Sequence, residues 1–525
     1  MDQASGEETE ADLEVDPRRW WTLMVLCLSL FMVIMGNTVL NVALPKMSEA
    51  LSASGSQLQW IVDAYSLVFA GLLFTSGSLG DRFGRKGALT TGLLIFGVGS
   101  ALATFADSAG MVIGCRAIMG LGAALVMPST LSILTHVFPP EERAKAIGVW
   151  AGVAGAAGAV GPITSGWLLE HFYWGSVFWL NVPVVATAII GGYFLVPTSR
   201  HPDRVPLDPI GALISIAAIV SLVYGVIEAP VYGWTDSLIL GSFLVAAVLL
   251  AVFIVWELRT TDPMLDMRYF RRRGFTGGSL AMSMVFFGMF GMFFLLTQYL
   301  QMVRGYSALG AGVRTLPFSA VMMVTAPSSA ALAARFTTRS VVTAGLAIAG
   351  TGMLLMASNT TTSGYGLLAL SLCVLAAGMG LTMAPATASI MSSLPQAKAG
   401  VGSAMNDTVR ELGGALGVAV LGSLTVSAYG HTVSGVTAGL PPALGAEVSH
   451  SLGDALRVAG ELGPRAPEVI GVAQQGFVDG MARGLSVGAG VAFAGAVVAA
   501  FVLPRRVRDD LTVAPSAEPV PSAAR

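Results

Sequence analysis

The amino-acid sequence predicts an all-α integral membrane protein with about fourteen membrane-spanning helices. Of its 525 residues, 54% are hydrophobic and only 11% are charged, whereas soluble domains carry about 25% charged residues. Apolar runs of about 20 residues, the length that crosses a bilayer as a helix, recur along the chain. Lys and Arg gather on alternate loops between these runs, which is typical of membrane proteins.

The predicted spans follow one another with short polar connections. Glycine and proline occur inside several of them and are tolerated because neighbouring helices can satisfy the freed backbone groups. The expected spans are residues 20–44, 57–79, 88–106, 110–134, 144–169, 176–196, 209–228, 238–257, 275–302, 310–334, 340–358, 365–392, 402–429 and 484–503.

The distribution of basic residues predicts the orientation of the chain. An even number of spans places both termini on one side, together with the basic loop at 82–86 and the arginine run at 271–273. The opposite side carries few basic residues, such as Lys46. Since cytoplasmic loops are enriched in Lys and Arg, both termini are expected in the cytoplasm.

The most informative motif joins the second and third spans. Residues 77–86 read Gly-Ser-Leu-Gly-Asp-Arg-Phe-Gly-Arg-Lys and place one acid and three bases between two apolar runs. Charge this dense is costly unless it lies at the water interface, and the glycines permit a tight turn. We expect Asp81 just past the end of the second span, paired with Arg82, Arg85 and Lys86. A loop that only sets topology would not require this ordered pattern.

The pattern resembles the signature between spans two and three of major facilitator superfamily transporters. Residues 115–122 resemble the fourth-span motif of that family, and residues 152–166 resemble the fifth-span antiporter motif. Residues 37–45 are similar to the first span of fourteen-span drug:proton antiporters. Within that group, residues 173–183 look most like the quaternary-ammonium and methyl-viologen exporters. The resemblance covers about residues 20–505.

The resemblance implies two six-helix bundles related by a pseudo-two-fold axis, with two extra helices between them. The expected parts are a disordered cytoplasmic tail at 1–19, a first bundle at 20–200, the extra helices at 201–260, a second bundle at 261–503 with a long extracellular loop at 430–483, and a cytoplasmic tail at 504–525. The resemblance also assigns a gating motif and an antiporter motif. Their residues are Gly77, Gly80, Asp81, Arg82, Gly84, Arg85 and Lys86 for the first, and Gly158, Gly161 and Pro162 for the second.

Charged side chains inside the spans are candidates for proton coupling. A charge at the bilayer centre costs about 2.5–3.5 kcal/mol even on the mildest scale, so Arg116 requires a partner or a water-filled cavity. The resemblance makes Arg116 part of proton coupling, and a structural ion pair is the alternative. Asp63 lies about two turns into the second span, where a carboxyl group could bind and release protons. An acid at the external interface is the alternative for Asp63.

Span thirteen carries a second polar cluster. Spacings of three and four place Asp407, Arg410 and Glu411 on one helix face, so an internal ion pair leaves one acid free to titrate. A salt bridge near the cytoplasmic interface is the alternative. Glu228 and Glu257 fall at span ends and are interpreted as interfacial.

The predicted substrate cavity is apolar and adaptable. Span nine is rich in Met and Phe, which suit varied ligands, although core or lipid-facing packing accounts for most such residues. The candidate substrate contacts are Asn41, Trp60, Asp63, Tyr65, Phe286, Phe290 and Gln298.

One position departs from the pattern of the resembled family. Relatives usually carry an aspartate immediately before Asn37, and this chain has Gly36. The departure places export of divalent cations in doubt and leaves more of the proton coupling to Asp63 and the acids of span thirteen. An aspartate at position 36 would then be expected to extend activity toward dications.

Together these features predict proton-coupled export of small amphipathic or cationic drugs by alternating access, with the proton gradient as driving force and no cofactor. The sequence has no Walker loop and no nucleophile–base set or metal-ligand cluster, which argues against an ATP-driven pump and an enzyme. Drugs, protons and the lipid bilayer are the expected partners, without nucleic acid. We expect a monomer in a bacterial cytoplasmic membrane. The alternative is an uncoupled lipid or natural-product facilitator of the same fold.

Overall fold

The structure is a computed structural model that describes residues 17–198, 208–261, 263, 265–394, 399–458 and 463–505. The elements formed by these residues are all helices, which confirms the all-α prediction. The expected tails at 1–19 and 504–525 fall outside the described residues except for 17–19 and 504–505.

The first bundle is built from the N-terminal part of the chain. Its elements are α1 (Arg19–Leu51), α2 (Gly55–Phe83), α3 (Arg85–Thr104), α4 (Ala109–Val137), α5 (Pro140–His171), α6 (Ser176–Trp179) and α7 (Asn181–Leu195). A capping box starts α2: the Gln57 N–H donates to the Ser54 hydroxyl at 3.1 Å, and the Ser54 N–H donates to the Gln57 side chain at 3.0 Å.

Helix α2 ends later than the sequence predicted. Asp81 was expected just past the helix, but α2 continues through Phe83 and Asp81 lies in its last turn. The chain turns into α3 at Gly84 alone, whose φ of 115° favours glycine. A single glycine in this conformation makes the turn, so the charged residues before it remain helical.

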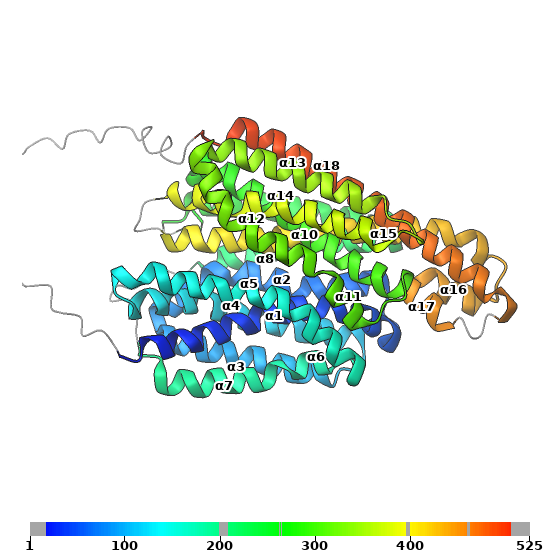
Figure 1. Cartoon of the computed structure of the whole chain (residues 1–525), viewed down its shortest axis with the longest axis horizontal. Coiled ribbons are helices and arrows are strands. Elements are labelled where there is room, and N and C mark those ends of the chain that lie inside the picture. Colours follow the sequence, from blue (N-terminus) through cyan, green and yellow to red (C-terminus); the bar gives the residue numbers. More distant parts are fainter. Residues whose placement is uncertain are drawn as a thin grey trace, which may run out of the picture.

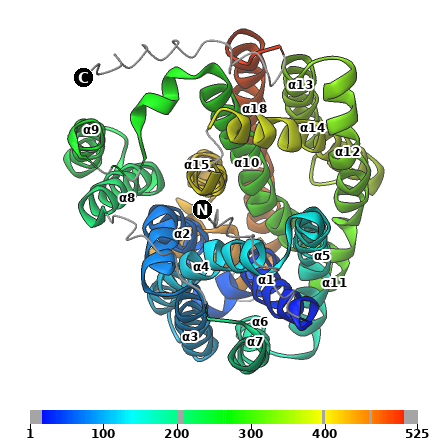
Figure 2. The same cartoon turned by 90° about the vertical axis from the view of Figure 1, so that its left-hand side faces the viewer.

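Two further helices, which lie between the two bundles along the sequence, form a hairpin. They are α8 (Pro209–Tyr232) and α9 (Ser237–Arg259), which pack against each other. Asp208 accepts from the Gly211 N–H and Asp236 accepts from the Leu238 N–H, each at 2.8 Å, so both helices begin with a side-chain cap. Helix α8 also contacts α2, and Figure 2 shows the hairpin at the side of the molecule.

The second bundle is built from the C-terminal part of the chain. Its elements are η1 (Met267–Arg271), α10 (Arg273–Gln298), η2 (Tyr299–Val303), α11 (Ala308–Arg314), α12 (Leu316–Arg335), α13 (Thr338–Ala357), α14 (Tyr365–Ser392), α15 (Ala399–Thr437) and α18 (Ala466–Val502). Between α15 and α18 lie α16 (Pro442–His450), α17 (Leu452–Arg457) and η5 (Gly463–Arg465). We call α16 and α17 the cap.

The predicted loop at 430–483 is largely helical, and that expectation was wrong. Helix α15 extends to Thr437 and α18 starts at Ala466, so both continue past the apolar runs that marked them. Hydropathy detects the part of a helix that suits lipid, whereas backbone hydrogen bonding continues into the cap. Tyr429 of α15 anchors α16 by donating its hydroxyl to the Val448 carbonyl at 2.7 Å.

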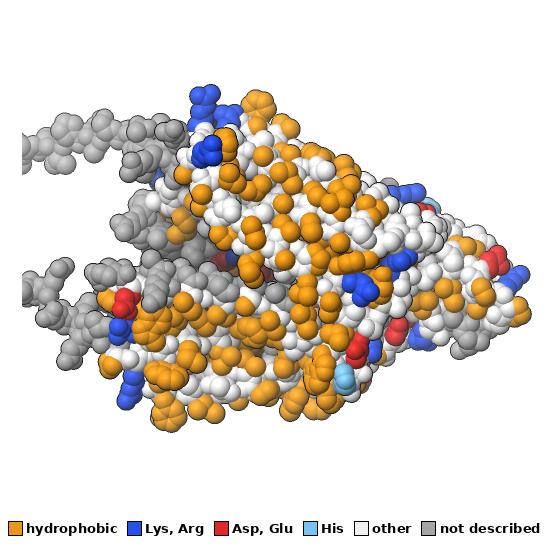
Figure 3. Space-filling model, viewed as in Figure 1, with side chains coloured by type: hydrophobic (Ala, Val, Ile, Leu, Met, Phe, Trp, Pro, Cys, Tyr) orange, Lys and Arg blue, Asp and Glu red, His pale blue; other side chains and the backbone are white. Residues whose placement is uncertain are grey.

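Twelve of the helices in the described part are long and apolar enough to cross a membrane. Helices α2 and α5, which carry the gating and antiporter motifs, are not among these twelve but have 29 and 32 residues. Fourteen spans therefore stay a prediction. Figure 3 shows hydrophobic side chains covering the flank of the molecule, with charged side chains gathered toward its two ends.

The long helices run roughly side by side along the molecule, as Figure 1 shows. The described chain ends lie at one end, called here the terminal end, and the cap lies at the other, the cap end. The bundles meet along two helix pairs, α2 with α15 and α5 with α11. Toward the cap end, Gln301 Nε2 donates to the Val42 carbonyl at 2.8 Å, and the Leu309 N–H donates to Glu170 Oε1 at 3.3 Å.

An ion pair inside the cap depends on pH. His450 Nδ1 lies 2.9 Å from Asp454 Oδ2, and the hydrogen bond with Asp454 raises the pKa of His450 above its ordinary value. The pair therefore adds stability that is fully present below the unfolded pKa of about 6.5 and is lost as pH rises through the higher folded pKa. Because His450 is half exposed, this contribution stays within about 1 kcal/mol.

Replacing His450 by Asn is expected to remove this pH dependence. In the wild type, amide hydrogen exchange at residues 451–458, corrected for intrinsic rates, should quicken as pH rises from about 6 to 8. His450→Asn should exchange fast at both values, whereas His431→Asn, at an exposed histidine of α15, should behave as the wild type. Wild-type protection that does not change with pH would contradict the ion-pair assignment.

Candidate transport site

Arg116 of α4 is the centre of a buried polar cluster in the first bundle. Its side chain is fully buried. Nε donates to the Ile61 carbonyl at 3.0 Å, Nη2 donates to Asn37 Oδ1 at 2.8 Å, and Nη1 donates to the Gly36 carbonyl at 3.4 Å. The guanidinium carbon lies 4.3 Å from the centroid of the Tyr65 ring. Arg116 therefore links α1, α2 and α4 through neutral groups.

Asp63 of α2 is an acid in the same region. Its carboxyl group is completely buried, and neither oxygen has a hydrogen-bond partner among the described residues. Its charge interacts with that of Arg116, which binds the backbone of α2 two residues earlier at Ile61. An ionised carboxyl group without a donor is costly in an apolar interior, so Asp63 is suited to hold a proton or a cation.

Glu411 brings the second bundle to this cluster. Helix α15 packs along α2, and Glu411 faces Ser66, about one turn beyond Asp63. Its Oε2 is buried without a hydrogen-bond partner in the described part of the chain. The charge of Glu411 also interacts with that of Arg116. The cluster therefore crosses the interface between the two bundles.

Asp407 and Arg410 form the ion pair that their spacing predicted. Arg410 Nη1 lies 3.4 Å from Asp407 Oδ1, and both side chains are partly buried. The Arg410 guanidinium lies 4.7 Å from the centroid of the Phe286 ring, which packs edge-on to Phe290 at 5.7 Å. The predicted proton-coupling set thus contains three acids and two bases, which leaves one carboxyl group without a compensating base.

The candidate substrate contacts do not all lie together. Trp60 Nε1 donates to Glu228 Oε1 at 3.0 Å, so Trp60 faces the α8–α9 hairpin. Tyr65 is fully buried beneath Arg116, where its hydroxyl donates to the Val33 carbonyl at 3.4 Å. Tyr65 is therefore covered by the surrounding helices, whereas Trp60 is only partly buried, and substrate contact at both positions stays a prediction.

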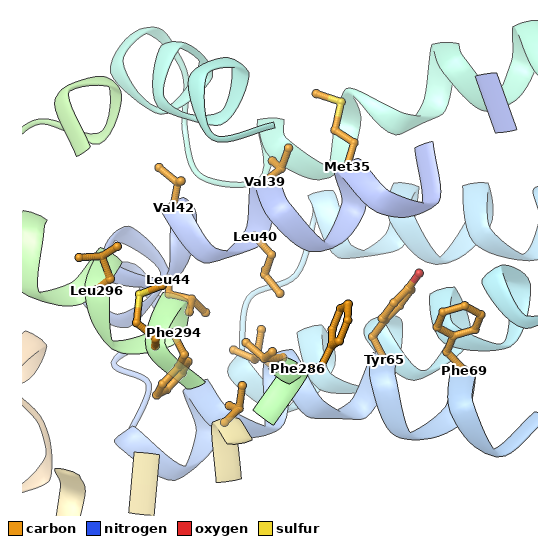
Figure 4. Close-up of a cluster of buried hydrophobic side chains, with 14 of the residues drawn as sticks. Met35, Val39, Leu40, Val42, Leu44, Tyr65, Phe69, Phe286, Phe294 and Leu296 are labelled. Carbon is orange, nitrogen blue, oxygen red and sulfur yellow. The ribbon is translucent and has the colours of Figure 1, made fainter. Parts of the chain in front are cut away.

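The remaining candidates divide between two levels. Figure 4 shows Tyr65 on α2 and Phe286 on α10 among buried apolar side chains of both bundles. Phe286 lies beside Arg410 of α15 and packs against Phe290. Gln298 instead lines a separate small cavity under the cap. Asn41 Nδ2 donates to the Asn37 carbonyl at 3.4 Å, within α1.

Gly36 of α1 faces α3 and α4 inside the first bundle. A Cβ at Gly36 would lie 3.0 Å from Phe96 Cζ of α3 and 3.9 Å from Met119 Cε of α4. An aspartate at position 36 would therefore point into the first bundle, beside Arg116, whose Nη1 binds the Gly36 carbonyl. Whether such an acid extends activity toward dications stays a prediction.

The gating motif is described in part. Gly80 brings α2 close to α3 and α4, since a Cβ there would lie 3.4 Å from Ala88 Cβ and 3.4 Å from Ser129 Oγ. Arg85 Nη1 donates to the Ser132 carbonyl of α4 at 3.4 Å, and Lys86 Nζ donates to the Tyr193 carbonyl of α7 at 2.8 Å. The side chains of Asp81 and Arg82, and Gly77, lie outside the described residues.

The antiporter motif lets α5 pack closely on both neighbours. A Cβ at Gly161 would collide with the side chain of Thr38 on α1, and the Pro162 carbonyl lies against Gly312 of α11. At Gly158 a Cβ would meet no described atom within 4 Å. Gly161 and Pro162 therefore serve close packing, whereas no described atom lies close to Gly158.

Replacing Gly161 by Ala is expected to destabilise the protein by about 1–3 kcal/mol, the usual cost of overpacking. The collision cannot be relieved by rotation of the Thr38 side chain alone, because the Thr38 Cβ itself lies 2.9 Å from the added atom. Gly158→Ala is the matched control and should unfold thermally as the wild type does. Equal losses in the two variants would contradict the packing role of Gly161.

Two functional neighbours were missed by sequence reasoning. Asn37 supplies the side-chain acceptor for Arg116, and Ser66 faces Glu411 across the bundle interface. The signal for Ser66 was its spacing of three from Asp63, which places both on one helix face. The spacing becomes informative only once it is known which helix packs against that face.

Comparisons with known proteins agree with this architecture. The family model described as "Major Facilitator Superfamily" matches residues 26–418. The chain is 36% identical over 94% of its length to the multidrug efflux pump LfrA of Mycolicibacterium smegmatis, covering 98% of that protein. It is 34% identical over 99% of its length to the tetracenomycin C resistance and export protein of Streptomyces glaucescens, of which it covers 98%. It is 35% identical over 88% of its length to the methyl viologen resistance protein SmvA of Salmonella typhimurium, of which it covers 93%.

A solved structure has the same fold. It is a bacterial homolog of the human lysosomal transporter Spinster in an inward-facing, unoccupied conformation, and it matches with a TM-score of 0.66 at 19% identity. The match covers 92% of this chain and 98% of that one. The family match, the curated relatives and the bundle architecture agree, and the chain belongs to the major facilitator superfamily of membrane transporters, as the 77–86 signature predicted.

Proposed function

We propose that this protein exports small amphipathic or cationic drugs in exchange for protons by alternating access. The observation that carries the proposal is the fully buried Asp63 carboxyl group, which lacks a hydrogen-bond donor among the described residues and interacts with Arg116 and, through it, with Glu411 of the other bundle. Proton binding and cation binding at such a group exclude each other, because each neutralises the same charge. That exclusion is the requirement for antiport.

The arrangement of the bundles supports a state open at the terminal end. The hydrogen bonds of Gln301 to Val42 and of Leu309 to Glu170 join the bundles toward the cap end, and α17 contacts α1 there. We assign the terminal end to the cytoplasm, with both termini there, in a bacterial cytoplasmic membrane. In the opposite, outward-open state the gating motif with Asp81, Arg82 and Arg85 would latch the cytoplasmic side.

The proposed cycle uses the interface between α2 and α15. A drug enters from the cytoplasm toward the apolar surface around Phe286 and Phe290 and favours the ionised form of the cluster. Rotation of the bundles then exposes the cluster outside, where protons replace the drug. The printed names of the relatives, which include methyl viologen and tetracenomycin C resistance, support this substrate class. We further propose that the protein is a monomer with fourteen spans.

Drug-induced proton movement in reconstituted liposomes tests the proposal. A pH-sensitive dye inside the vesicles reports the collapse of an imposed pH gradient. A dication, a monovalent cationic dye and an uncharged aromatic antibiotic are added in turn. Only those compounds that the protein transports should collapse the gradient. Empty liposomes control for passive leakage of weak bases. Drug flux without any proton movement would favour the alternative, an uncoupled lipid or natural-product facilitator.

A further inference from the structure

Two buried carboxyl groups meet where the α8–α9 hairpin begins and ends. Glu257, near the end of α9, is 2% exposed, and Asp208, which caps α8, is 8% exposed. Asp208 accepts from the Gly211 N–H at 2.8 Å and from Trp256 Nε1 at 3.0 Å. The sequence placed Glu257 at a span end as an interfacial residue, but the fold buries it.

Glu257 has one donor for its two oxygens. Oε2 accepts from the Leu265 N–H at 2.9 Å, whereas Oε1 is buried without a hydrogen-bond partner among the described residues. Oε1 and Asp208 Oδ2 converge on Gly211, where a Cβ would lie 2.7 Å from Oε1 and would also collide with Oδ2. The group that faces the unpartnered oxygen is therefore another hydrogen-bond acceptor.

We propose that Asp208 and Glu257 form a proton-binding site in which one proton is shared between Asp208 Oδ2 and Glu257 Oε1. Two ionised carboxylates in contact repel each other, so one of the two holds a proton. A single O–H···O bond supplies Oε1 with its missing partner and leaves one negative charge on the pair. Trp256 and the Gly211 N–H stabilise that charge on Asp208.

The charged surroundings favour a shared proton over an ion pair. Among the described residues, the other charged group that interacts with Glu257 is Asp266, an acid, which lies 4.0 Å from Arg268. No described base lies within salt-bridge distance of Asp208 or Glu257. Because the pair lacks a cationic partner in the described part of the chain, a proton is the smallest ligand that balances it.

The site joins three segments of the chain at the terminal end. Asp208 starts α8, Glu257 ends α9, and Leu265 lies on the connection to η1 and α10 of the second bundle. It is separate from the Asp63 cluster, which lies between α2 and α15. Loss of the shared proton would set the two carboxylates against each other and displace the Glu257 side chain, which carries the acceptor of the Leu265 N–H, so the proton holds the connection after α9 against the hairpin.

Infrared difference spectroscopy on the full-length protein in lipid nanodiscs tests the site. The wild type at pH about 6 should show the C=O stretch of a protonated carboxyl group that disappears on titration toward pH about 9, the range in which buried carboxyl groups can titrate. Glu257→Gln should lose this component, so that a carboxyl band remains in the wild-type-minus-Glu257→Gln difference, whereas bands from Asp63 and Glu411 cancel in the subtraction. The introduced amide can donate to Asp208 and accept from Leu265, so the variant keeps the contacts of the protonated pair. Glu228→Gln, at the other end of α8, is the matched control and should keep the band.

Amide hydrogen exchange of residues 265–271 gives a second readout. After correction for intrinsic rates, protection should fall severalfold in the wild type over the same pH range and stay constant in Glu257→Gln. Should Glu257→Gln not fold, Asp208→Asn provides the same comparison. The absence of a carboxyl band from the wild-type-minus-Glu257→Gln difference overturns the proposal, as does protection that depends on Na⁺ at constant pH, which would assign a metal cation to the site.

Discussion

Replacing Asp63 by Asn is expected to abolish the coupling of drug movement to proton movement. Because the Asp63 carboxyl group is buried and accepts no hydrogen bond from the described residues, the neutral amide can take its place but cannot release a proton. We expect the drug-driven proton flux in liposomes to fall on the order of 100-fold, the scale seen in enzymes that lose a proton-transferring side chain.

The same substitution makes a second, independent prediction. Asp63→Asn removes a carboxylate that no described donor compensates, and Glu411 still supplies a negative charge near Arg116, so thermal unfolding of the purified variant should change little or shift upward. Asp479→Asn is the matched control, because Asp479 is partly exposed on α18 and accepts from Gln475 Nε2 at 2.8 Å. Coupled flux at the wild-type rate in a stable Asp63→Asn protein would remove Asp63 from the proposed mechanism.

Replacing Arg116 by Met is expected to destabilise the protein strongly and to stop transport. The substitution leaves Asn37 Oδ1 and the Ile61 carbonyl without their donor and leaves Asp63 without the nearby positive charge. Breaking a buried charged network by removing one partner costs about 3–5 kcal/mol. Arg116→Lys should recover only part of this, because an ammonium group cannot reproduce the planar fork that reaches three acceptors.

A double substitution separates charge from packing at this site. Removal of the Asp63 charge should be stabilising in the absence of Arg116, so Asp63→Asn combined with Arg116→Met should unfold at a higher temperature than Arg116→Met alone. Non-additivity of about 0.5–3 kcal/mol is usual for residues in one network. Strict additivity of the two stability changes would show that Asp63 and Arg116 are not coupled.

The sequence predicted the family and most of the charged cluster because an ionisable residue inside an apolar run is informative by itself. Asp63, Arg116 and the 407–411 group were all identified in this way, and the structure brings Arg116 near both Asp63 and Glu411. The substrate contacts were harder to predict. Trp60 faces the α8–α9 hairpin and Tyr65 lies beneath Arg116, since the face that a helix turns toward the centre depends on its neighbours.

The ends of the helices also separate what the sequence reveals from what the packing decides. Hydropathy located the lipid-facing segments, but α15 and α18 continue beyond them to Thr437 and from Ala466, because helical hydrogen bonding does not require apolar side chains. Glu257 shows what the sequence could not give. Its position at a span end suggested an interfacial residue, and the connection after α9 folds back and buries it against Asp208.

The sequence by itself determined the all-α membrane class, the superfamily and the ionisable residues inside the apolar runs, because composition and motif order are local properties of the chain. Tertiary structure alone decided which of these residues meet. Asp63 and Glu411 are more than 300 residues apart in sequence, and only the packing of α2 on α15 brings them to one cluster. The burial that suits these carboxyl groups to the proposed exchange of a proton for a drug is a property of that packing.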